Sequence, residues 1–305
     1  MKTIIKILVL FLIVFVSCSK NDNPQTKVKQ LTIFFVNDVH GQIDNFSKIK
    51  HIIDLEKQKT NVIIASSGDL FSGNPIVDNS VEKGYPMVDL MNRLEFDIAV
   101  LGNHEFDYGI DILKQRNEQA NFDWICANVN SGNTSMPQPE AYKTIEKEDL
   151  KITFLGLVET NGKQNGTIPS AHPWKMEGLT FERPENVIDQ YSNIKSLEGS
   201  DLYIALSHLG YGGSGKILGD VTLAEQYPWF DLIIGGHSHQ IINTTINNIP
   251  IFQSGSYLHN LGKIELTIKN KKIKSYNFEL IDLDKYQEFD PEIKTIIDEY
   301  MNYPI

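Results

Sequence analysis

The sequence has few cysteines, few arginines and no excess of positive charge. Its 305 residues include 2 Cys, and the formal net charge at pH 7 is −11. A broad nucleic-acid surface would need a basic stripe, so no nucleic-acid polymer is expected as a partner. A small anionic substrate is not excluded, because a bound metal can reverse the local field.

Arginine occurs only at positions 93, 116 and 183, and none of the three lies within the polar motifs described below. An arginine side chain grips phosphate through two parallel N–H groups. No such bidentate fork for phosphate is evident from the sequence.

No hydrophobic run approaches the roughly 20 residues that a membrane-spanning helix needs. The apolar run from Ile7 to Val16 follows two lysines and is typical of a signal-peptide core. With Ser17-Cys18 and the polar stretch after it, the start resembles a bacterial lipoprotein signal. We therefore expect a signal peptide at 1–17, an acylated Cys18, a linker at 18–29 and export to a periplasmic or cell-surface membrane. Phe15 departs from the usual cleavage box, so plain secretion stays open.

The second cysteine, Cys126, lies inside the apolar stretch "FDWICANV". If Cys18 carries lipid, Cys126 has no partner, and a buried core thiol is expected. If it does not, an exported chain could form one disulfide between the two.

Apolar runs alternate with helical patterns in the first half of the chain. Short β-rich runs predict buried strands, and the segments between them have helical periodicity. This order predicts an α/β fold with parallel pairing. The strands are expected at 31–36, 61–66, 97–102 and 124–129, and the helices at 46–58, 85–95 and 109–120.

The second half begins in the same style, with strands expected at 151–158, 201–208 and from 231. Three further runs, at 249–255, 261–269 and 271–281, follow without a helix and predict an antiparallel meander. The chain then closes with a helix over 290–303. Asp290 is its expected N-cap, and Pro291 its first helical residue.

Five polar clusters stand at the ends of predicted strands: "NDVHG" (37–41), "SGDLFSG" (67–73), "GNHEFD" (102–107), "SHLG" (207–210) and "GGHSH" (235–239). The carboxyl ends of parallel strands share one edge of a sheet, where ligands usually bind. The side chains expected to meet there are Asp38, His40, Asp69, Asn103, His104, His208, His237 and His239.

Each cluster alone is ambiguous. A lone Asp such as Asp69 after a strand is more often a turn residue or helix cap, and His208 alone is a weak signal. Asp38 and His40 are more telling, since alternate residues of an extended chain face the same side and can grip one ion. His237 and His239 have the same spacing after two glycines.

Carboxylates and imidazoles together suit divalent Zn, Mn or Fe. The candidates are too many for one tetrahedral site and suit two ions that share a ligand. Two ions about 3.5–4 Å apart can clamp the attacking and leaving oxygens of a displacement. Such a pair would leave a net positive charge that attracts phosphate.

The stretches "GNHEFDYG", "ALSHLG" and "IIGGHSH" resemble the calcineurin-like metallophosphoesterase superfamily, and more closely the N-terminal domain of secreted 5'-nucleotidases and UDP-sugar hydrolases. The resemblance runs from about Leu31 to Ile281. It implies a four-layer α/β/β/α sandwich with two mixed β-sheets. It also implies a metallophosphoesterase domain at 30–285 and a C-terminal helix at 286–305 like the helix between the domains of those enzymes.

The resemblance also implies the residue roles. Asp38, His40, Asp69 and His239 would hold the first metal; Asp69, Asn103, His208 and His237 would hold the second. His104 would stabilise charge on the phosphoryl group, with Asp107 one helical turn later fixing its imidazole. Glu105 has no expected role beyond a solvated or capping position. The implied reaction is in-line attack of metal-activated water on a phosphate monoester, with a nucleotide as the expected substrate.

The related two-domain nucleotidases continue with a second domain that binds the base and the phosphates. Either a separate chain supplies that domain and docks on the terminal helix, or this domain acts alone as a general or cyclic phosphoesterase. A sulfur-ester hydrolase and a non-catalytic metal-binding surface lipoprotein are the alternatives of another class. The intact His104–Asp107 pair argues against the non-catalytic alternative.

Overall fold

The computed structural model describes residues 27–163, 168, 171–213 and 217–302. The expected signal peptide, Cys18 and the linker up to residue 26 lie outside the described residues. Within the described ranges, no helix is long and apolar enough to cross a membrane.

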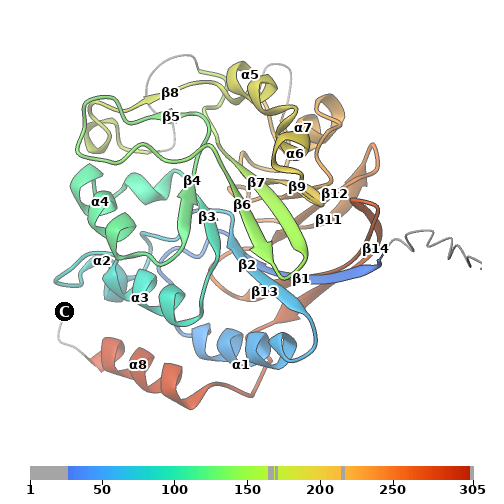
Figure 1. Ribbon diagram of the computed structural model, residues 1–305. Coiled ribbons are helices and arrows are strands. Elements are labelled where there is room, and N and C mark those ends of the chain that lie inside the picture. The colour runs from blue at the N-terminus through green and yellow to red at the C-terminus, as the bar shows by residue number, and fades with distance from the viewer. Residues whose placement is uncertain (1–26, 164–167, 169–170, 214–216, 303–305) are drawn as a thin grey trace, which may run out of the picture.

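Two six-stranded mixed sheets stack face to face (Figure 1). The first has the order β14-β13-β1-β2-β3-β4, with β1 to β4 parallel and β13 antiparallel to both β1 and β14. Its strands are β1 (Lys29–Val36), β2 (Asn61–Ser66), β3 (Ile98–Val100), β4 (Asp123–Ile125), β13 (Asn260–Lys269) and β14 (Lys272–Asp282).

The second sheet has the order β11-β12-β10-β9-β7-β6, with four central parallel strands and one antiparallel strand at each edge. Its strands are β6 (Tyr142–Lys147), β7 (Leu150–Val158), β9 (Leu202–His208), β10 (Leu232–Ile234), β11 (Ile241–Ile246) and β12 (Ile249–Ser254). A separate short pair joins β5 (Val129–Asn130) to β8 (Thr180–Phe181).

The parallel strands β1, β2 and β3 of the first sheet are buried on both faces, which explains their nearly continuous apolar sequences. In β1, Ile33 and Phe35 point into the core between the two sheets. Phe34 and Val36 point the other way, into the core beneath the helices. One strand therefore contributes to two separate hydrophobic layers.

Helices cover the outer face of each sheet (Figure 1). On the first sheet lie α1 (Phe46–Lys57), α3 (Tyr85–Arg93), α4 (Ile110–Gln119) and α8 (Pro291–Asn302). On the second lie α6 (Ile194–Glu198) and α7 (Asp220–Gln226), with α5 (Pro184–Val187) and the 3-10 turn η3 (Ile188–Tyr191) nearby. Short α2 (Pro75–Asp78) and the turns η1 (His104–Phe106) and η2 (Pro173–Lys175) complete the described elements. The expected four-layer α/β/β/α sandwich with two mixed β-sheets is confirmed.

The C-terminal helix begins as expected. Asp290 accepts a hydrogen bond from the backbone N–H of Ile293 at 2.8 Å, and Pro291 is the first helical residue. Ile293 and Ile297 are buried in the same hydrophobic cluster as α1. Cys126 is a free and buried thiol, as expected, and burial raises its pKa to about 12.

The antiparallel meander predicted for 249–281 is wrong in its first strand. β12 belongs to the second sheet, where it pairs with β10 and β11, whereas β13 and β14 form a hairpin in the first. The chain crosses between the sheets at residues 255–259. Both sheets face the same core, so an apolar run does not reveal to which of them it belongs.

The single strand predicted at 124–129 is also wrong, because the chain leaves the sheet after Ile125 and resumes pairing at Val129. The Asn128 side chain makes hydrogen bonds to backbone groups that a continuing strand would otherwise make. It donates to the carbonyls of Val158 and Glu182, each at 2.9 Å, and accepts from the Val158 N–H at 2.9 Å.

Candidate metal centre

The five polar clusters meet at one edge of the sandwich, where strands of both sheets end. β1, β2 and β3 run parallel in the first sheet, and β9 and β10 run parallel in the second. The loops that follow them carry the candidate ligands, except His208, which is the last residue of β9. Residues more than two hundred positions apart in the sequence thereby become neighbours.

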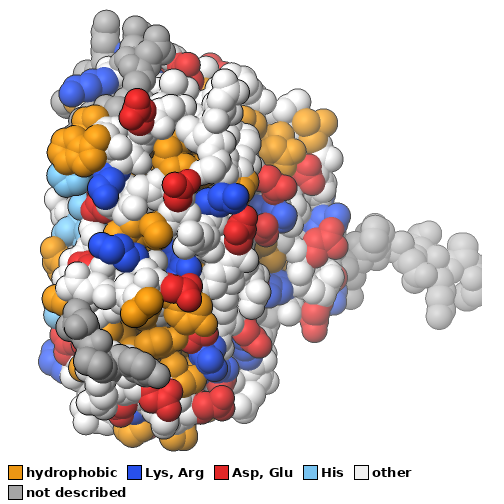
Figure 2. Space-filling view, turned by 90° about the vertical axis from the view of Figure 1, so that its left-hand side faces the viewer, with side chains coloured by type: hydrophobic (Ala, Val, Ile, Leu, Met, Phe, Trp, Pro, Cys, Tyr) orange, Lys and Arg blue, Asp and Glu red, His pale blue; other side chains and the backbone are white. Residues whose placement is uncertain are grey.

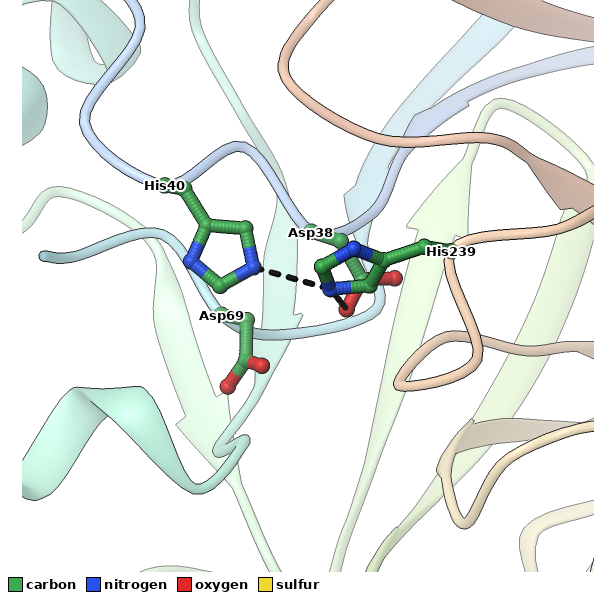
Figure 3. Close-up of side chains that lie close together, drawn as sticks. All are labelled: Asp38, His40, Asp69 and His239. Carbon is green, nitrogen blue, oxygen red and sulfur yellow. Dashed lines mark hydrogen bonds and ion pairs between the residues drawn. The ribbon is translucent and has the colours of Figure 1, made fainter. Parts of the chain in front are cut away.

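Two groups of side chains have metal-ligand geometry. The ligand atoms of Asp38, His40, Asp69 and His239 all lie within 4.8 Å of one another, and so do those of Asp69, His208 and His237. Figure 3 shows His40 and His239 pointing toward each other from separate loops, with the carboxylates of Asp38 and Asp69 beside them. Asp69 belongs to both groups and is therefore placed to bridge two ions.

Asn103 lies against the second group. Its side-chain oxygen is 3.0 Å from Nδ1 of His237. The backbone N–H of His237 donates to both carboxylate oxygens of Asp38, each at 3.0 Å. The two groups are thus tied together through the loop after β10, and all seven candidate ligands converge.

The expectation that Asp38 and His40 share a face of an extended strand is wrong. Both have left-handed backbone conformations, with φ of 52° and 50°. Their N–H groups donate to Gly68 O and Asp69 O, each at 3.0 Å, so they lie in a turn that leans on the loop after β2. Asp69, His237 and His239 also have positive φ, at 54°, 71° and 56°. Such conformations are uncommon outside glycine and cluster at functional sites.

His208 provides the clearest test of fit to a metal. It is fully buried, and its Nδ1 lies 2.6 Å from the carbonyl oxygen of Ser67. Its Nε2 is 3.0 Å from Oδ2 of Asp69 but makes no hydrogen bond. With the proton on Nδ1, the unprotonated Nε2 of His208 and the carboxylate oxygen of Asp69 both direct lone pairs into the same space. Ligands around a cation are arranged in this way. These residues fit a divalent ion.

The electrostatics of this pair lead to the same conclusion. Burial alone would lower the pKa of His208, but the Asp69 carboxylate raises it to about 10. Burial would likewise raise the pKa of Asp69, and the His208 imidazole reverses that and lowers it. The space between the two side chains therefore favours a positive charge, from a proton or from a metal.

Two of the other imidazoles, those of His40 and His237, are held in the neutral form that binds metals, whereas the hydrogen bond to Asp38 raises the pKa of His239. Burial lowers the pKa of His40, whose Nδ1 lies 3.1 Å from Ser72 O and whose Nε2 is 3.0 Å from Nε2 of His239. Burial, followed by the neighbouring His208, lowers the pKa of His237 to about 4. In both residues the ligand nitrogen is available at neutral pH.

His104 and Asp107 form the expected pair beside the ligand groups. Nδ1 of His104 is 2.6 Å from Oδ2 of Asp107, and the hydroxyl of Ser72 lies 3.2 Å from the same nitrogen. Burial would lower the pKa of His104, but the hydrogen bond to Asp107 raises it to about 9. The ring lies 4.9 Å from that of His40, centroid to centroid, so a protonated imidazole stands at the edge of the ligand cluster.

The expectation that Glu105 is solvated or a cap is wrong. Its side chain is fully buried, because the η1 turn points it beneath the loop after β2. It accepts hydrogen bonds from the N–H groups of Asp69, Leu70 and Gly102 at 2.9, 2.6 and 2.6 Å. Burial, with the nearby Asp69 carboxylate, raises its pKa to about 7. Glu105 fixes the backbone that carries Asp69, and nothing in the sequence distinguishes it from a surface acid.

Asn37 was missed by the sequence analysis. It donates to Asp38 Oδ2 at 2.7 Å and to Gly255 O at 2.6 Å, and its own oxygen accepts from the Ser254 N–H at 2.8 Å. It therefore joins the ends of β1 and β12, one in each sheet. The only signal in the sequence was its position next to a candidate ligand.

A buried network under the loop after β10 was also missed. Asp220 accepts from the Ser207 hydroxyl at 2.6 Å and from the Gln253 amide at 2.7 Å, and Gln253 accepts from the Ser238 hydroxyl at 2.7 Å. A Cβ on Gly235 would lie 2.0 Å from Oδ2 of Asp220, so this position requires glycine. The network connects the loop of His208 to that of His237 and His239.

Comparison with known proteins agrees with this geometry. Residues 31–241 match the family model described as calcineurin-like phosphoesterase. A 5'-nucleotidase of Vibrio cholerae is 28% identical over an alignment of 310 positions, and the alignment covers 88% of this chain and 55% of the relative. The chain thus spans about half the length of the curated relatives it matches.

Solved structures share the fold. The calcineurin-like phosphoesterase YfkN of Bacillus subtilis superimposes with a TM-score of 0.77 at 22% identity, covering 90% of this chain and 97% of that one. A 5'-nucleotidase precursor from Thermus thermophilus gives a TM-score of 0.77 at 20% identity, with 89% and 58% covered. With a family model that matches more than half of its length, this chain belongs to the calcineurin-like phosphoesterase family.

Proposed function

We propose that this chain is a phosphoesterase that holds two divalent cations and hydrolyses phosphate monoesters, with nucleotides as the substrate class. The observation that carries the proposal is the pair of ligand groups that share Asp69. Asp38, His40, Asp69 and His239 would hold one ion, and Asp69, Asn103, His208 and His237 the other. Their mixture of carboxylate, amide and imidazole groups suits Mn, Zn or Fe.

The two cations, when bound, would supply Lewis-acid polarisation of the phosphate and lower the pKa of water. His104 has the role of the charge stabiliser. Because its Nδ1 is bonded to Asp107, its Nε2–H edge is left to donate to a phosphoryl oxygen. Its raised pKa keeps that proton in place at neutral pH.

Asp107 and Ser72 orient the imidazole. The hydroxyl of Ser72 donates to Asp107, and its carbonyl accepts from His40, so one residue connects the charge stabiliser to a proposed ligand. Glu105 holds the backbone of Asp69 from below. The chain would thus bring a preorganised donor and a rigid ligand set to the same phosphate.

Support for a nucleotide substrate comes from the relatives. The match from Vibrio cholerae is named a 5'-nucleotidase, and one from Haemophilus influenzae is named a 2',3'-cyclic-nucleotide 2'-phosphodiesterase/3'-nucleotidase. Both names describe hydrolysis of phosphoester bonds in nucleotides. The substrate panel must therefore include cyclic nucleotides.

The deciding experiment measures metal content and turnover on one sample of the purified chain. The panel contains AMP, a 2',3'-cyclic nucleotide, a nucleotide sugar, glycerol 2-phosphate and p-nitrophenyl phosphate. We expect about two divalent ions per chain, hydrolysis of AMP, and loss of activity on chelation that Mn²⁺ or Zn²⁺ restores. A fully loaded chain that hydrolyses none of these esters would overturn the proposal.

We also propose export and lipid attachment at Cys18. Support comes from the sequence alone, since residues 1–26 lie outside the described part of the chain. Cys18→Ser is expected to abolish labelling by a fatty-acid precursor and to release the protein from the membrane fraction. Unchanged membrane association of that variant would contradict lipid anchoring.

A separate chain that supplies a base-binding domain is a further proposal. The relatives are about twice as long as the matched region, which supports a role for additional substrate-binding surface. Affinity purification of the tagged chain from its native membranes tests it. A specific partner that raises AMP turnover would support it, and full AMP selectivity of the purified chain alone would contradict it.

A further inference from the structure

Tyr257 lies at the mouth of the ligand cluster and has no role in the mechanism proposed above. Its ring centroid is 5.2 Å from that of His40 and 5.5 Å from that of His239. The side chain nevertheless remains 43% exposed. Part of an aromatic residue next to two proposed ligands is therefore open to solvent.

Hydrogen bonds fix the backbone of the turn that carries this ring relative to the centre. The N–H of Tyr257 donates to the carbonyl oxygen of Asp38 at 2.7 Å. Leu258, the next residue, is buried in the core, and its carbonyl accepts from Asn45 at 3.1 Å. On the other side, the carbonyl of Gly255 accepts from Asn37 at 2.6 Å. The turn that presents Tyr257 is thus fixed at three points, two of them on Asn37 and Asp38.

The turn is also conformationally unfavourable. Tyr257 and Leu258 have φ of 55° and 54°, in the left-handed region that bulky residues avoid. Leu258 accounts for the anchoring in the core, but packing does not require an aromatic ring at the exposed position before it. Strained residues of this kind are typical of sites where a side chain is presented to a ligand.

A second apolar side chain adjoins this turn. Ile241 is 57% exposed and lies beside Gly255, where a Cβ would come within 3.4 Å of its side chain. Figure 2 shows hydrophobic side chains next to histidine side chains along the left-hand margin of that view. The turn beside the proposed metal centre thus presents apolar side chains close to the proposed ligands.

We propose that Tyr257, with Ile241 next to Gly255 of the same turn, binds the planar base of the substrate while the phosphate occupies the proposed dinuclear site. A partly exposed ring on a fixed turn loses little entropy when a base stacks on it, and stacking on an aromatic ring is strong and tolerates any base. The inference rests on the proposed function and gives the single chain its own contribution to nucleotide selectivity.

The test compares a nucleotide with an aliphatic ester in the metal-loaded protein. The quantity measured is the ratio of kcat/KM for AMP to kcat/KM for glycerol 2-phosphate. Tyr257→Leu removes the ring but keeps an apolar side chain, and it is expected to lower the ratio about tenfold. Tyr257→Phe removes only the hydroxyl and is expected to keep the ratio. Trp174→Leu, at another exposed aromatic residue, is the matched control and is expected to stay within about twofold of wild type.

Two outcomes would overturn the inference. One is an unchanged ratio in Tyr257→Leu. The other is an equal loss for both esters together with a fall in metal content, which would mean that Tyr257 only supports His40 and His239. Calorimetric binding of AMP to the metal-loaded variants provides a readout without turnover. If wild type hydrolyses no ester, the proposed function fails, and weaker AMP binding by Tyr257→Leu still decides the role of Tyr257.

Discussion

At the scale of single residues, the chemistry depends on one donor placed next to a ligand cluster. His104 is protonated and oriented, but it is not one of the seven candidate ligands. His104→Asn should therefore keep the metals and lose about 10²-fold or more in kcat, the usual cost of removing an electrostatic stabiliser. Metal analysis and steady-state kinetics on the same preparation check this. If kcat is unchanged, His104 has no part in the reaction.

Asp107 sets the range of pH over which His104 can donate. The hydrogen bond from His104 raises the folded-state pKa of the imidazole to about 9, so the donor is present below that pH and is lost as the pH rises through it. Asp107→Asn removes this support and should move the alkaline limb of kcat toward 6.5, the ordinary pKa of histidine. A pH–rate profile of both proteins measures the shift. The same alkaline limb in the variant would show that a different group controls it.

Glu105 illustrates what a sequence does not reveal about a residue. Three backbone N–H groups converge on its buried carboxylate. Glu105→Gln replaces one acceptor oxygen with a donor, which would then face an N–H group and leave it unsatisfied at a cost of about 1–3 kcal/mol. We expect a Tm lower by several degrees and weaker metal binding, measured by calorimetry and metal titration. Glu118→Gln, an exposed acid on α4, is the control; equal effects of the two substitutions would contradict the structural role of Glu105.

At the scale of elements, regular structure could be predicted where a local pattern determines it. The helix at 46–58 and the strands at 31–36 and 61–66 have periodicity and boundaries that depend on their own residues. β12 could not be placed, because its apolar sequence fits either sheet, and the choice between them is made by tertiary packing. The turn conformations of Asp38 and His40 were likewise missed, since they depend on hydrogen bonds to Gly68 and Asp69 rather than on neighbours in sequence.

The start of α8 is an element whose stability depends on one side chain. Asp290 caps the first turn through the Ile293 N–H, and the helix then buries Ile293 and Ile297 against the core. Asp290→Ala should cost about 1 kcal/mol, the typical value of an N-cap. For a domain of this size that corresponds to a Tm lower by about 2–4 °C. Asp298→Ala in the last turn removes only an exposed ion pair with Lys294 and should change the Tm less, so an equal loss would contradict the capping role.

At the scale of the whole molecule, the proposed centre lies at an edge that belongs to neither sheet alone. The core between the sheets consists of strand residues, so the stacked sheets do not depend on a bound ion, although the core beneath the helices of the first sheet also contains Val39, Leu70 and Phe71 from the ligand loops. The convergence of those loops was expected from the shared carboxyl edge of parallel strands and from the family resemblance, whereas the hydrogen bonds that enforce it, from Asn37, Glu105 and Asp220, became visible only in three dimensions. Fold and centre are therefore separable in stability.

Metal removal tests this separation. Chelation should leave the far-ultraviolet circular dichroism intact, because the sandwich is built from its apolar layers. It should nevertheless lower the Tm, because ions that bind only the folded state stabilise it by about 2.7 kcal/mol when their free concentration is 100 times the Kd.

Asp69→Asn removes the carboxylate shared by both ligand groups and should make the Tm independent of added Mn²⁺. Asp54→Asn, whose carboxylate pairs with Lys50 on the surface of α1, should keep the full metal response. If the Asp69→Asn protein still gains stability from the metal to the same degree as wild type, the ions bind elsewhere and the proposed dinuclear centre is wrong.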